Sequence, residues 1–179
     1  YSAVQIETTG QEISLLATDK YRMALCELPW KANAGAEGQS VLVPARTLLE
    51  VAKTFANQGD IAVSIINNDE RQMIAFQANN RSVTALLIKG NYPPIKSMFP
   101  TELANFTVVS KADLLESTRR VMLVVQRDNA LKYSFSDSEI ALESMGNETA
   151  QASENISAEL TGEETVLALK PQYLIDGLA

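Results

Sequence analysis

Few residues of this chain have side chains suited to catalysis. Its 179 residues include no histidine and one cysteine, Cys26. This composition excludes Ser-His-Asp and Cys-His catalysis, imidazole metal ligands and an intrachain disulfide. Two acidic pairs, Asp69/Glu70 and Asp137/Glu139, could serve a carboxylate enzyme, but they fall at expected hairpin turns without a P-loop or nucleotide fingerprint. We therefore expect no catalytic residue, metal site or cofactor, and we expect Cys26 to be a small buried apolar residue.

The basic residues are more informative, because they are segregated from the acidic ones. The whole chain has 15 bases, 22 acids and a formal charge of −7, which does not suggest a nucleic-acid binder. Residues 128–179 contain 10 acids and 2 bases, a net of −8, so the remaining residues carry +1. The negative charge falls mostly on expected strands and turns. Such segregation would let an acidic protein hold DNA against one surface.

Two expected helices each carry basic residues opposite an apolar stripe. At about 100° per residue, Arg46 and Lys53 lie opposite the stripe of the first helix. That stripe consists of Leu48, Val51 and Phe55. Arg120 and Arg127 lie opposite the stripe of the second helix, with Arg119 on its shoulder. The second stripe consists of Leu114, Val121, Met122 and Val125.

The beginnings of these helices are marked in the sequence. Pro44 suits the first turn of a helix, because its missing N–H would have no partner there. Ser110, three residues before Asp113, forms a variant of the capping box. The basic faces have two interpretations, an ordinary solvated face or a surface that contacts DNA phosphates without reading bases. The same arrangement on both helices favours the second.

The rest of the chain is mostly strand. We expect strands at Tyr1–Glu7, Glu12–Thr18, Arg22–Leu28, Ser40–Val43, 61–65, Met73–Ala78, Arg81–Ile88, Phe106–Val109, Leu131–Phe135, Ile140–Met145, Thr149–Leu160 and Val166–Leu169. Proline and glycine interrupt the pattern from Lys89 to Leu103. The sequence therefore predicts an α+β chain with domains at 1–100 and 101–179.

An internal repeat relates the two domains. A shift of 127 residues places Glu12 on Glu139, Ile13 on Ile140, Leu15 on Leu142, Leu42 on Leu169, Pro44 on Pro171 and Leu48 on Ile175. Chance similarity between two strand-rich regions is the alternative. A true repeat would give each domain a sheet with two helices on one side. The chain would then be the end of one repeat joined to the start of the next, and we expect a fragment of a longer protein.

Four segments, in order, resemble the bacterial DNA polymerase III β subunit family, the sliding clamps. They are ATDKYRMA at Ala17–Ala24, VLVP at Val41–Pro44, LIKGNYP at Leu87–Pro93 and LKPQYLID at Leu169–Asp176. Lys20-Tyr21 stands where Gly-His is common in the family, so we expect the rim of the family's peptide pocket to differ there.

The resemblance implies the DNA-clamp fold, in which repeated domains place antiparallel sheets outside and two helices per domain inside. Residues 1–100 would be most of the second, central domain, lacking its start, and residues 101–179 the third, C-terminal domain, lacking its end. Such a subunit is a non-catalytic processivity factor that encircles duplex DNA as a homodimer. Its partners would be double-stranded DNA, the DNA polymerase III catalytic subunit, the clamp loader, and other polymerases and repair proteins. The residues that face the DNA would be Arg46, Lys53, Arg119, Arg120 and Arg127.

The resemblance also implies an apolar pocket for short partner peptides between the second and third domains. Its lining residues would be Thr18, Tyr21, Arg22, Met23, Pro93, Met98 and Tyr173. An apolar groove with one basic residue suits the anchor side chains of an extended peptide. Taken alone, Met23 and Met98 are more typical of core filling.

The cellular location is the cytoplasm by default. No stretch approaches the roughly 20 apolar residues of a membrane span, and no signal peptide is visible. The alternative function is a β-rich protein-interaction module without a DNA role, in which the basic helix faces would be ordinary surface.

Overall fold

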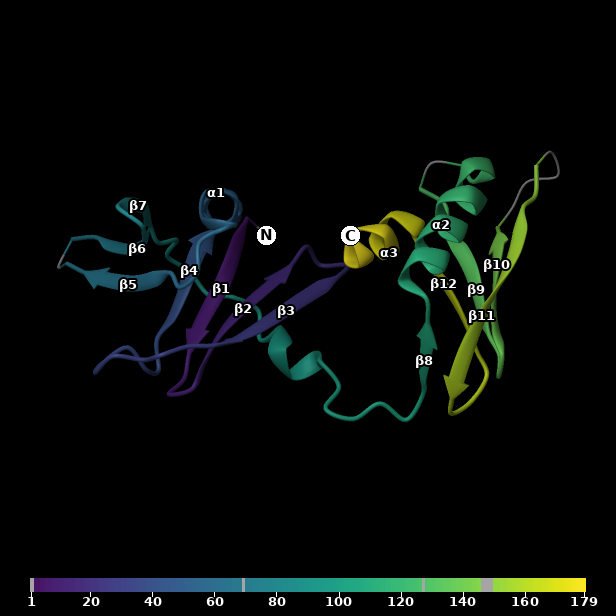
Figure 1. The fold of residues 1–179 in the computed structure, drawn as a ribbon, viewed down its shortest axis with the longest axis horizontal. Coiled ribbons are helices and arrows are strands. Elements are labelled where there is room, and N and C mark those ends of the chain that lie inside the picture. The colour runs from purple at the N-terminus through teal and green to yellow at the C-terminus, as the bar shows by residue number, and fades with distance from the viewer. Residues whose placement is uncertain (1, 69, 127, 146–149) are drawn as a thin grey trace. The chain divides into compact units, whose positions relative to one another are not determined.

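The computed structural model describes residues 2–68, 70–126, 128–145 and 150–179. The chain divides into two compact units, residues 1–99 and 100–179 (Figure 1). The boundary expected from the sequence, after Pro100, lies one residue further along the chain. Each unit is described by itself below. None of the described helices is long and apolar enough to cross a membrane.

In the residues that the structure describes, the first unit consists of two antiparallel sheets, one α-helix and one 3-10 turn. Its elements are β1 (Ala3–Thr8), β2 (Glu12–Thr18), β3 (Met23–Pro29), β4 (Ser40–Pro44), α1 (Ala45–Phe55), β5 (Ala62–Asn67), β6 (Gln72–Ala78), β7 (Arg81–Leu86) and η1 (Ile95–Met98). The strand orders are β3-β2-β1-β4 and β5-β6-β7. A single antiparallel bridge between Leu42 and Ile88 joins β4 to the segment after β7.

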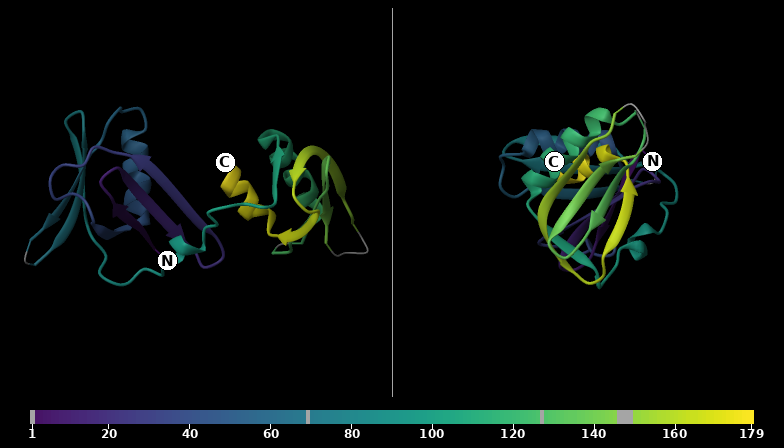
Figure 2. Two further views of the ribbon diagram at one scale, coloured as in Figure 1. Left: turned by 90° about the horizontal axis from the view of Figure 1, so that it is seen from below. Right: turned by 90° about the vertical axis from the view of Figure 1, so that its right-hand side faces the viewer.

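Helix α1 lies between the two sheets of this unit (Figure 2, left). Val51 and Phe55 are buried and Leu48 packs beside them, so the predicted stripe is confirmed. The sheets add buried residues to the same core, namely Ile6, Ile13, Val43, Ile74 and Phe76. Pro44 is the N-cap residue, one position before the first turn where it was expected.

The hairpin expected around Asn79 and Asn80 is confirmed. Strands β6 and β7 pair from Ala78↔Arg81 onward. Both asparagines have positive φ, 44° and 61°, as the two central residues of a type I′ turn require. Asparagine tolerates this left-handed conformation better than most residues with a side chain.

The described part of the second unit forms a five-stranded antiparallel sheet with two α-helices. Its elements are β8 (Phe106–Val109), α2 (Lys111–Val121), η2 (Met122–Val124), β9 (Leu131–Phe135), β10 (Glu139–Ser144), β11 (Ser153–Thr161), β12 (Thr165–Leu169) and α3 (Pro171–Leu178). The strand order is β12-β9-β10-β11-β8. Helices α2 and α3 lie on the same face of this sheet (Figure 1).

Helix α2 begins as predicted but ends earlier. The Ser110 hydroxyl accepts a hydrogen bond from the N–H of Asp113 at 3.3 Å, which confirms the cap. The expected continuation of the helix through Val125 is wrong. The chain tightens into a 3-10 turn after Val121 and becomes extended at Val125, and Leu123 is 82% exposed. A run of apolar residues that includes two valines disfavours continued α-helix, since β-branched side chains lose rotamer freedom there.

The repeat holds for the first hairpin of each unit. Ile6 pairs with Leu15 in β1–β2, and Tyr133 pairs with Leu142 in β9–β10. Adding 127 to each residue number of the first pair therefore gives the second pair. The strand orders β3-β2-β1-β4 and β11-β10-β9-β12 also correspond. The two sheets share one topology and one hairpin register.

The predicted alignment of α1 with α3 by the same shift of 127, without a gap, is wrong by one residue. Val4 pairs with Val43. Leu131 is the equivalent of Val4 in the second unit, and it pairs with Leu169. The two partner residues, Val43 and Leu169, are therefore 126 residues apart rather than 127. One additional residue therefore lies between strand and proline in the second unit. As a result Leu174, rather than Ile175, packs against the core in the place that corresponds to Leu48.

The expectation that Cys26 is buried is also wrong. Cys26 is exposed on β3, which is an edge strand. It pairs with Leu15 and so lies on the face of the sheet that α1 covers elsewhere. Ala24 and Leu28, on the same face of β3, are exposed as well. Among the described residues, no helix covers this end of the sheet.

Candidate functional site

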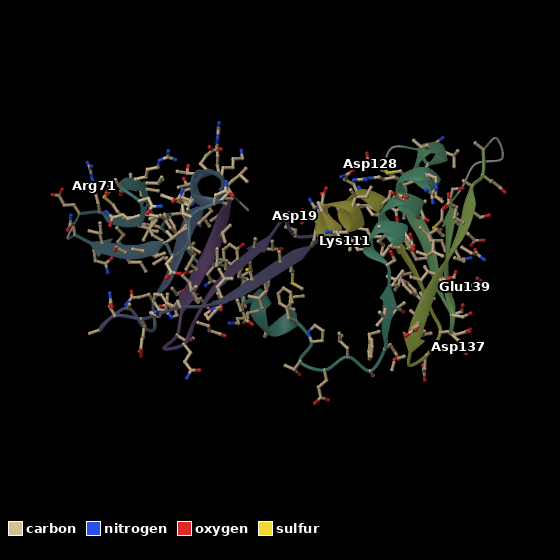
Figure 3. The ribbon with its side chains drawn as sticks, viewed as in Figure 1. Asp19, Arg71, Lys111, Asp128, Asp137 and Glu139 are labelled. Atoms are coloured by element: carbon tan, nitrogen blue, oxygen red, sulfur yellow. The ribbon has the colours of Figure 1, made fainter. Side chains whose placement is uncertain are left out.

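The acidic pair Asp137/Glu139 has a local structural role. Asp137 and Glu139 lie at the turn between β9 and β10 (Figure 3). The Glu139 carboxylate accepts a hydrogen bond from Asn155 Nδ2 at 3.1 Å, and the main-chain oxygen of Asp137 accepts one from the N–H of Leu160. Asp69 lies outside the described residues. Within the described part of the chain, no group of three or more Cys, Asp or Glu residues could hold a metal ion.

Helix α1 presents the two cations predicted for it. Arg46 and Lys53 are exposed, on the side of the helix away from Val51 and Phe55. Lys53 Nζ lies 3.3 Å from Glu50 Oε1 in an exposed ion pair, which holds the ammonium only weakly. Arg46 has no ion pair among the described residues, so its guanidinium is available to a ligand.

The two adjacent arginines of helix α2 differ in their ion pairs. Arg119 is exposed and makes no ion pair with the residues that the structure describes. Arg120 forms a two-pronged ion pair with Glu154 of β11, with Nε–Oε1 at 2.7 Å and Nη2–Oε2 at 2.8 Å. Its Nη2 also donates to the Ser117 hydroxyl at 3.1 Å. Arg127, the remaining predicted DNA-facing residue, lies outside the described residues.

The pair between Arg120 and Glu154 shifts both ionisation equilibria. The hydrogen bond from Arg120 lowers the pKa of Glu154 below its usual value of 4.5. The same hydrogen bond raises the pKa of Arg120. Each group therefore stabilises the charged form of the other, and a carboxylate of the sheet largely neutralises this guanidinium.

Buried polar residues on α2 explain why sequence reasoning placed Arg120 opposite the core. The buried residues of the helix are Leu114, Ser117, Thr118 and Val121. The Thr118 hydroxyl lies 3.2 Å from the buried Tyr133 hydroxyl, a hydrogen bond that satisfies both groups. Counting Ser117 and Thr118 in the stripe rotates it, so Arg119 lies opposite the core and Arg120 flanks it. Small hydroxyl residues at core spacing were the signal available in the sequence.

Asp19 organises the turn between β2 and β3 (Figure 3). Its Oδ1 accepts hydrogen bonds from the N–H groups of Tyr21 and Arg22, both at 3.0 Å, and its Oδ2 pairs with Arg22 Nε at 2.8 Å. The Thr18 hydroxyl donates to the carbonyl of Arg22 at 2.8 Å and accepts from the N–H of Lys20 at 3.2 Å. The Arg22 hydrogen bond is the largest of the effects that lower the pKa of Asp19 from 3.8 to about 2.

Thr18 and Met23 lie on the face of the β2–β3 hairpin away from α1. They pair directly across the hairpin, so their side chains share a face. The Tyr92 hydroxyl accepts a hydrogen bond from the N–H of Thr18 at 3.1 Å and donates to the carbonyl of Ala3 at 3.2 Å. Tyr92 thereby fixes the start of the following segment against the end of this hairpin.

The segment that contains Pro93 and Met98 crosses the same face of the sheet. Lys96, between them, donates to the Ser14 hydroxyl at 3.2 Å and lies 3.4 Å from a Glu27 carboxylate oxygen. Ser14 and Glu27 pair across β2 and β3 on the Thr18 side of the hairpin. Pro93 is half-buried, whereas Met98 is 65% exposed and is therefore not a core residue.

Six of the seven predicted pocket residues thus belong to the first unit, where they lie in the β2–β3 hairpin and in the segment from Pro93 to Met98. The seventh, Tyr173, is half-buried in α3 of the second unit. A separate hollow at the β10–β11 hairpin, lined by Lys132, Glu143, Ser144, Met145, Gln151, Ala152 and Ser153, contains none of the predicted site residues.

Comparisons with known proteins place both units in one family. The chain is 37% identical over 177 residues to the "Beta sliding clamp homolog GriR" of Streptomyces muensis, covering 99% of this chain and 47% of the relative. It is 32% identical over 179 residues to the "Beta sliding clamp" of Streptomyces coelicolor, covering 99% of this chain and 48% of that protein. The chain thus spans about half the length of these relatives.

Solved structures show the same fold. The crystal structure of the DNA polymerase III subunit beta from Pseudomonas aeruginosa matches with a TM-score of 0.86 at 21% identity, over 99% of this chain and 48% of that one. The protein-family model for the DNA polymerase III beta subunit central domain matches residues 2–94 of this chain. The family model for the C-terminal domain matches residues 96–179. The chain therefore belongs to the DNA polymerase III beta subunit family.

Proposed function

We propose that this chain is part of a ring-shaped DNA sliding clamp, a processivity factor without catalytic activity of its own. The membership of both units in the beta subunit family is the observation that carries the proposal. Residues 1–99 would be most of the central domain, and residues 100–179 the first part of the C-terminal domain. The full subunit would act in the cytoplasm and close as a homodimer around double-stranded DNA.

The exposed cations of α1 and α2 support a phosphate-contacting role. Arg46 and Arg119 are exposed without an ion pair in the described part of the chain, and Lys53 has only an exposed partner. Side chains of this kind contact phosphates and read no base edges, which permits sliding. Arg120 contributes less, because Glu154 occupies its guanidinium.

The hairpin turn and the segment after Tyr92 support a binding site for partner peptides. They contain an exposed tyrosine, Tyr21, an arginine, Arg22, and an exposed methionine, Met98. The partners would be the DNA polymerase III catalytic subunit, the clamp loader, and other polymerases and repair proteins that present a short apolar segment. Tyr173 would join this site in the assembled subunit.

Salt-dependent DNA binding by the full-length protein tests the DNA-facing surface. Arg46→Ala combined with Arg119→Ala should reduce the slope of log affinity against log salt by about 0.9 for each phosphate that the protein no longer neutralises. Arg81→Ala, an exposed arginine at the β6–β7 turn, is the matched control and should leave the slope unchanged. An unchanged slope in the double variant would favour the alternative, a protein-interaction module without a DNA role.

A further inference from the structure

The turn between β2 and β3 exposes a cation that the turn itself does not use. Lys20 has φ of 83°, the left-handed conformation that favours glycine over residues with a side chain. Its ammonium group forms no ion pair with any residue that the structure describes. Tyr21, the next residue, is 79% exposed. The turn therefore presents a cation without an ion pair directly beside an exposed aromatic ring.

The backbone that carries these two side chains is held rigidly. The Asp19 carboxylate binds two N–H groups of the turn and the Arg22 guanidinium, and the Thr18 hydroxyl closes the turn from the other side. Because these contacts occupy the Asp19 carboxylate, it does not neutralise Lys20. A ligand that binds here would therefore require little further ordering of the backbone, since the turn is already formed.

The apolar residues exposed on the same unit as Lys20 indicate the class of ligand. The Tyr21 ring and the exposed Met98 side chain offer apolar contact area on the same unit. A phosphate backbone would use the cation but would not require apolar surface beside it. A peptide that carries a carboxylate next to an apolar side chain would use both.

We propose that Lys20 selects partner peptides in which an acidic residue flanks the apolar residue that contacts Tyr21. The proposal rests on the proposed function, because it assumes that partner peptides bind at this end of the first unit. An exposed ion pair adds a modest increment to binding, so its effect is on selectivity between partners rather than on binding as such.

The test uses the full-length protein and a fluorescein-labelled clamp-binding peptide from the replicative polymerase of the same organism. The peptide is made with Asp or with Asn at each position that flanks its apolar anchor. At one such position the Asp form should bind about two- to fivefold more tightly than the Asn form. Lys20→Met and Lys20→Gly should remove this preference, and Lys20→Gly should not lower the midpoint of thermal unfolding.

Lys31→Met is the matched control, because Lys31 is an exposed lysine at the opposite end of the β2–β3 hairpin. It should retain the full preference for the Asp peptide. Equal affinity of all Asp and Asn forms for the unmodified protein, or a preference that survives Lys20→Met, would overturn this inference alone. A loss of DNA affinity in Lys20→Met with unchanged peptide selectivity would assign Lys20 to phosphate contact instead. Failure of every form to bind would contradict the peptide site itself.

Discussion

Arg120 of α2 and Glu154 of β11 are joined through two parallel hydrogen bonds of 2.7 and 2.8 Å. The same guanidinium reaches the buried Ser117 hydroxyl on its own helix. This geometry ties one shoulder of α2 to the sheet beneath it. Arg119, one residue earlier, has no ion pair with any residue that the structure describes. Adjacent arginines of identical chemistry thus have separate roles, one structural and one available to a ligand.

Replacing Arg120 with methionine should raise the pKa of Glu154 toward 4.5, because the main cause of its depression is removed. A carboxyl group with a lowered folded pKa contributes stability above its unfolded pKa, and this contribution is lost as pH falls through the folded pKa. The thermal midpoint of Arg120→Met should therefore lie below that of the unmodified protein at neutral pH. The difference should shrink in acid.

An NMR titration of the glutamate carboxyl carbons measures the pKa of Glu154 in both proteins. Arg119→Met provides the control, since Arg119 has no ion pair among the described residues and its loss should leave that pKa unchanged. A Glu154 pKa that is the same with and without Arg120 would contradict the assigned ion pair.

The hydrogen bond between Thr118 and Tyr133 should stabilise the second unit. Both side chains are buried, and burial raises the pKa of the Tyr133 hydroxyl. Thr118→Val removes one partner and leaves the other hydroxyl unpaired, which should cost about 1–3 kcal/mol of unfolding free energy in denaturant titrations. The double variant Thr118→Val with Tyr133→Phe should recover part of this loss. A fully additive double variant would show that the two hydroxyls are not coupled.

The turn held by Asp19 should remain intact well into acid. The pKa of Asp19 is lowered from 3.8 to about 2, so its contribution to stability is complete above about pH 3.8 and is lost as pH falls toward 2. Arg22→Gln removes the largest cause and should raise the Asp19 pKa, measured by NMR titration. An Asp19 pKa near 3.8 in the unmodified protein would contradict the hydrogen bonds assigned to this turn.

Local sequence patterns predicted most of the elements correctly. Turn residues and alternating apolar residues located the hairpins, and the displacement by 127 from Ile6↔Leu15 to Tyr133↔Leu142 followed from pattern alone. The capped start of α2 at Ser110 was equally visible, because capping depends on residues three apart.

The errors came from packing that local patterns do not report. Ser117 is polar in the sequence but buried in the structure, where its hydroxyl accepts a hydrogen bond from Arg120 Nη2, a group that also pairs with Glu154 of a strand. Cys26 is apolar in context but exposed, because it lies on an edge strand that no described helix covers. The displacement of the helix start by one residue depends on how β12 pairs with β9. Each of these features depends on residues distant in sequence.

The predicted peptide site can be tested by removing an arginine and a methionine together. Arg22 and Met98 would contribute a charged and an apolar contact, and one buried anchor contact can contribute more than about 1 kcal/mol. Arg22→Ala with Met98→Ala in the full-length protein should weaken binding of a fluorescent polymerase-derived peptide about tenfold or more. Leu123→Ala, a change at an exposed apolar residue of the second unit, should leave the affinity unchanged. Unchanged peptide affinity in the double variant would remove these residues from the site.

The most direct test of the clamp proposal compares DNA of two topologies. The full-length protein is loaded by its clamp loader onto a circular plasmid, and half of the sample is then linearised before gel filtration at high salt. A ring that encircles DNA is retained by topology rather than by affinity. The protein should therefore remain with the circular DNA and dissociate from the linear DNA. Equal retention on the two forms would contradict the proposal.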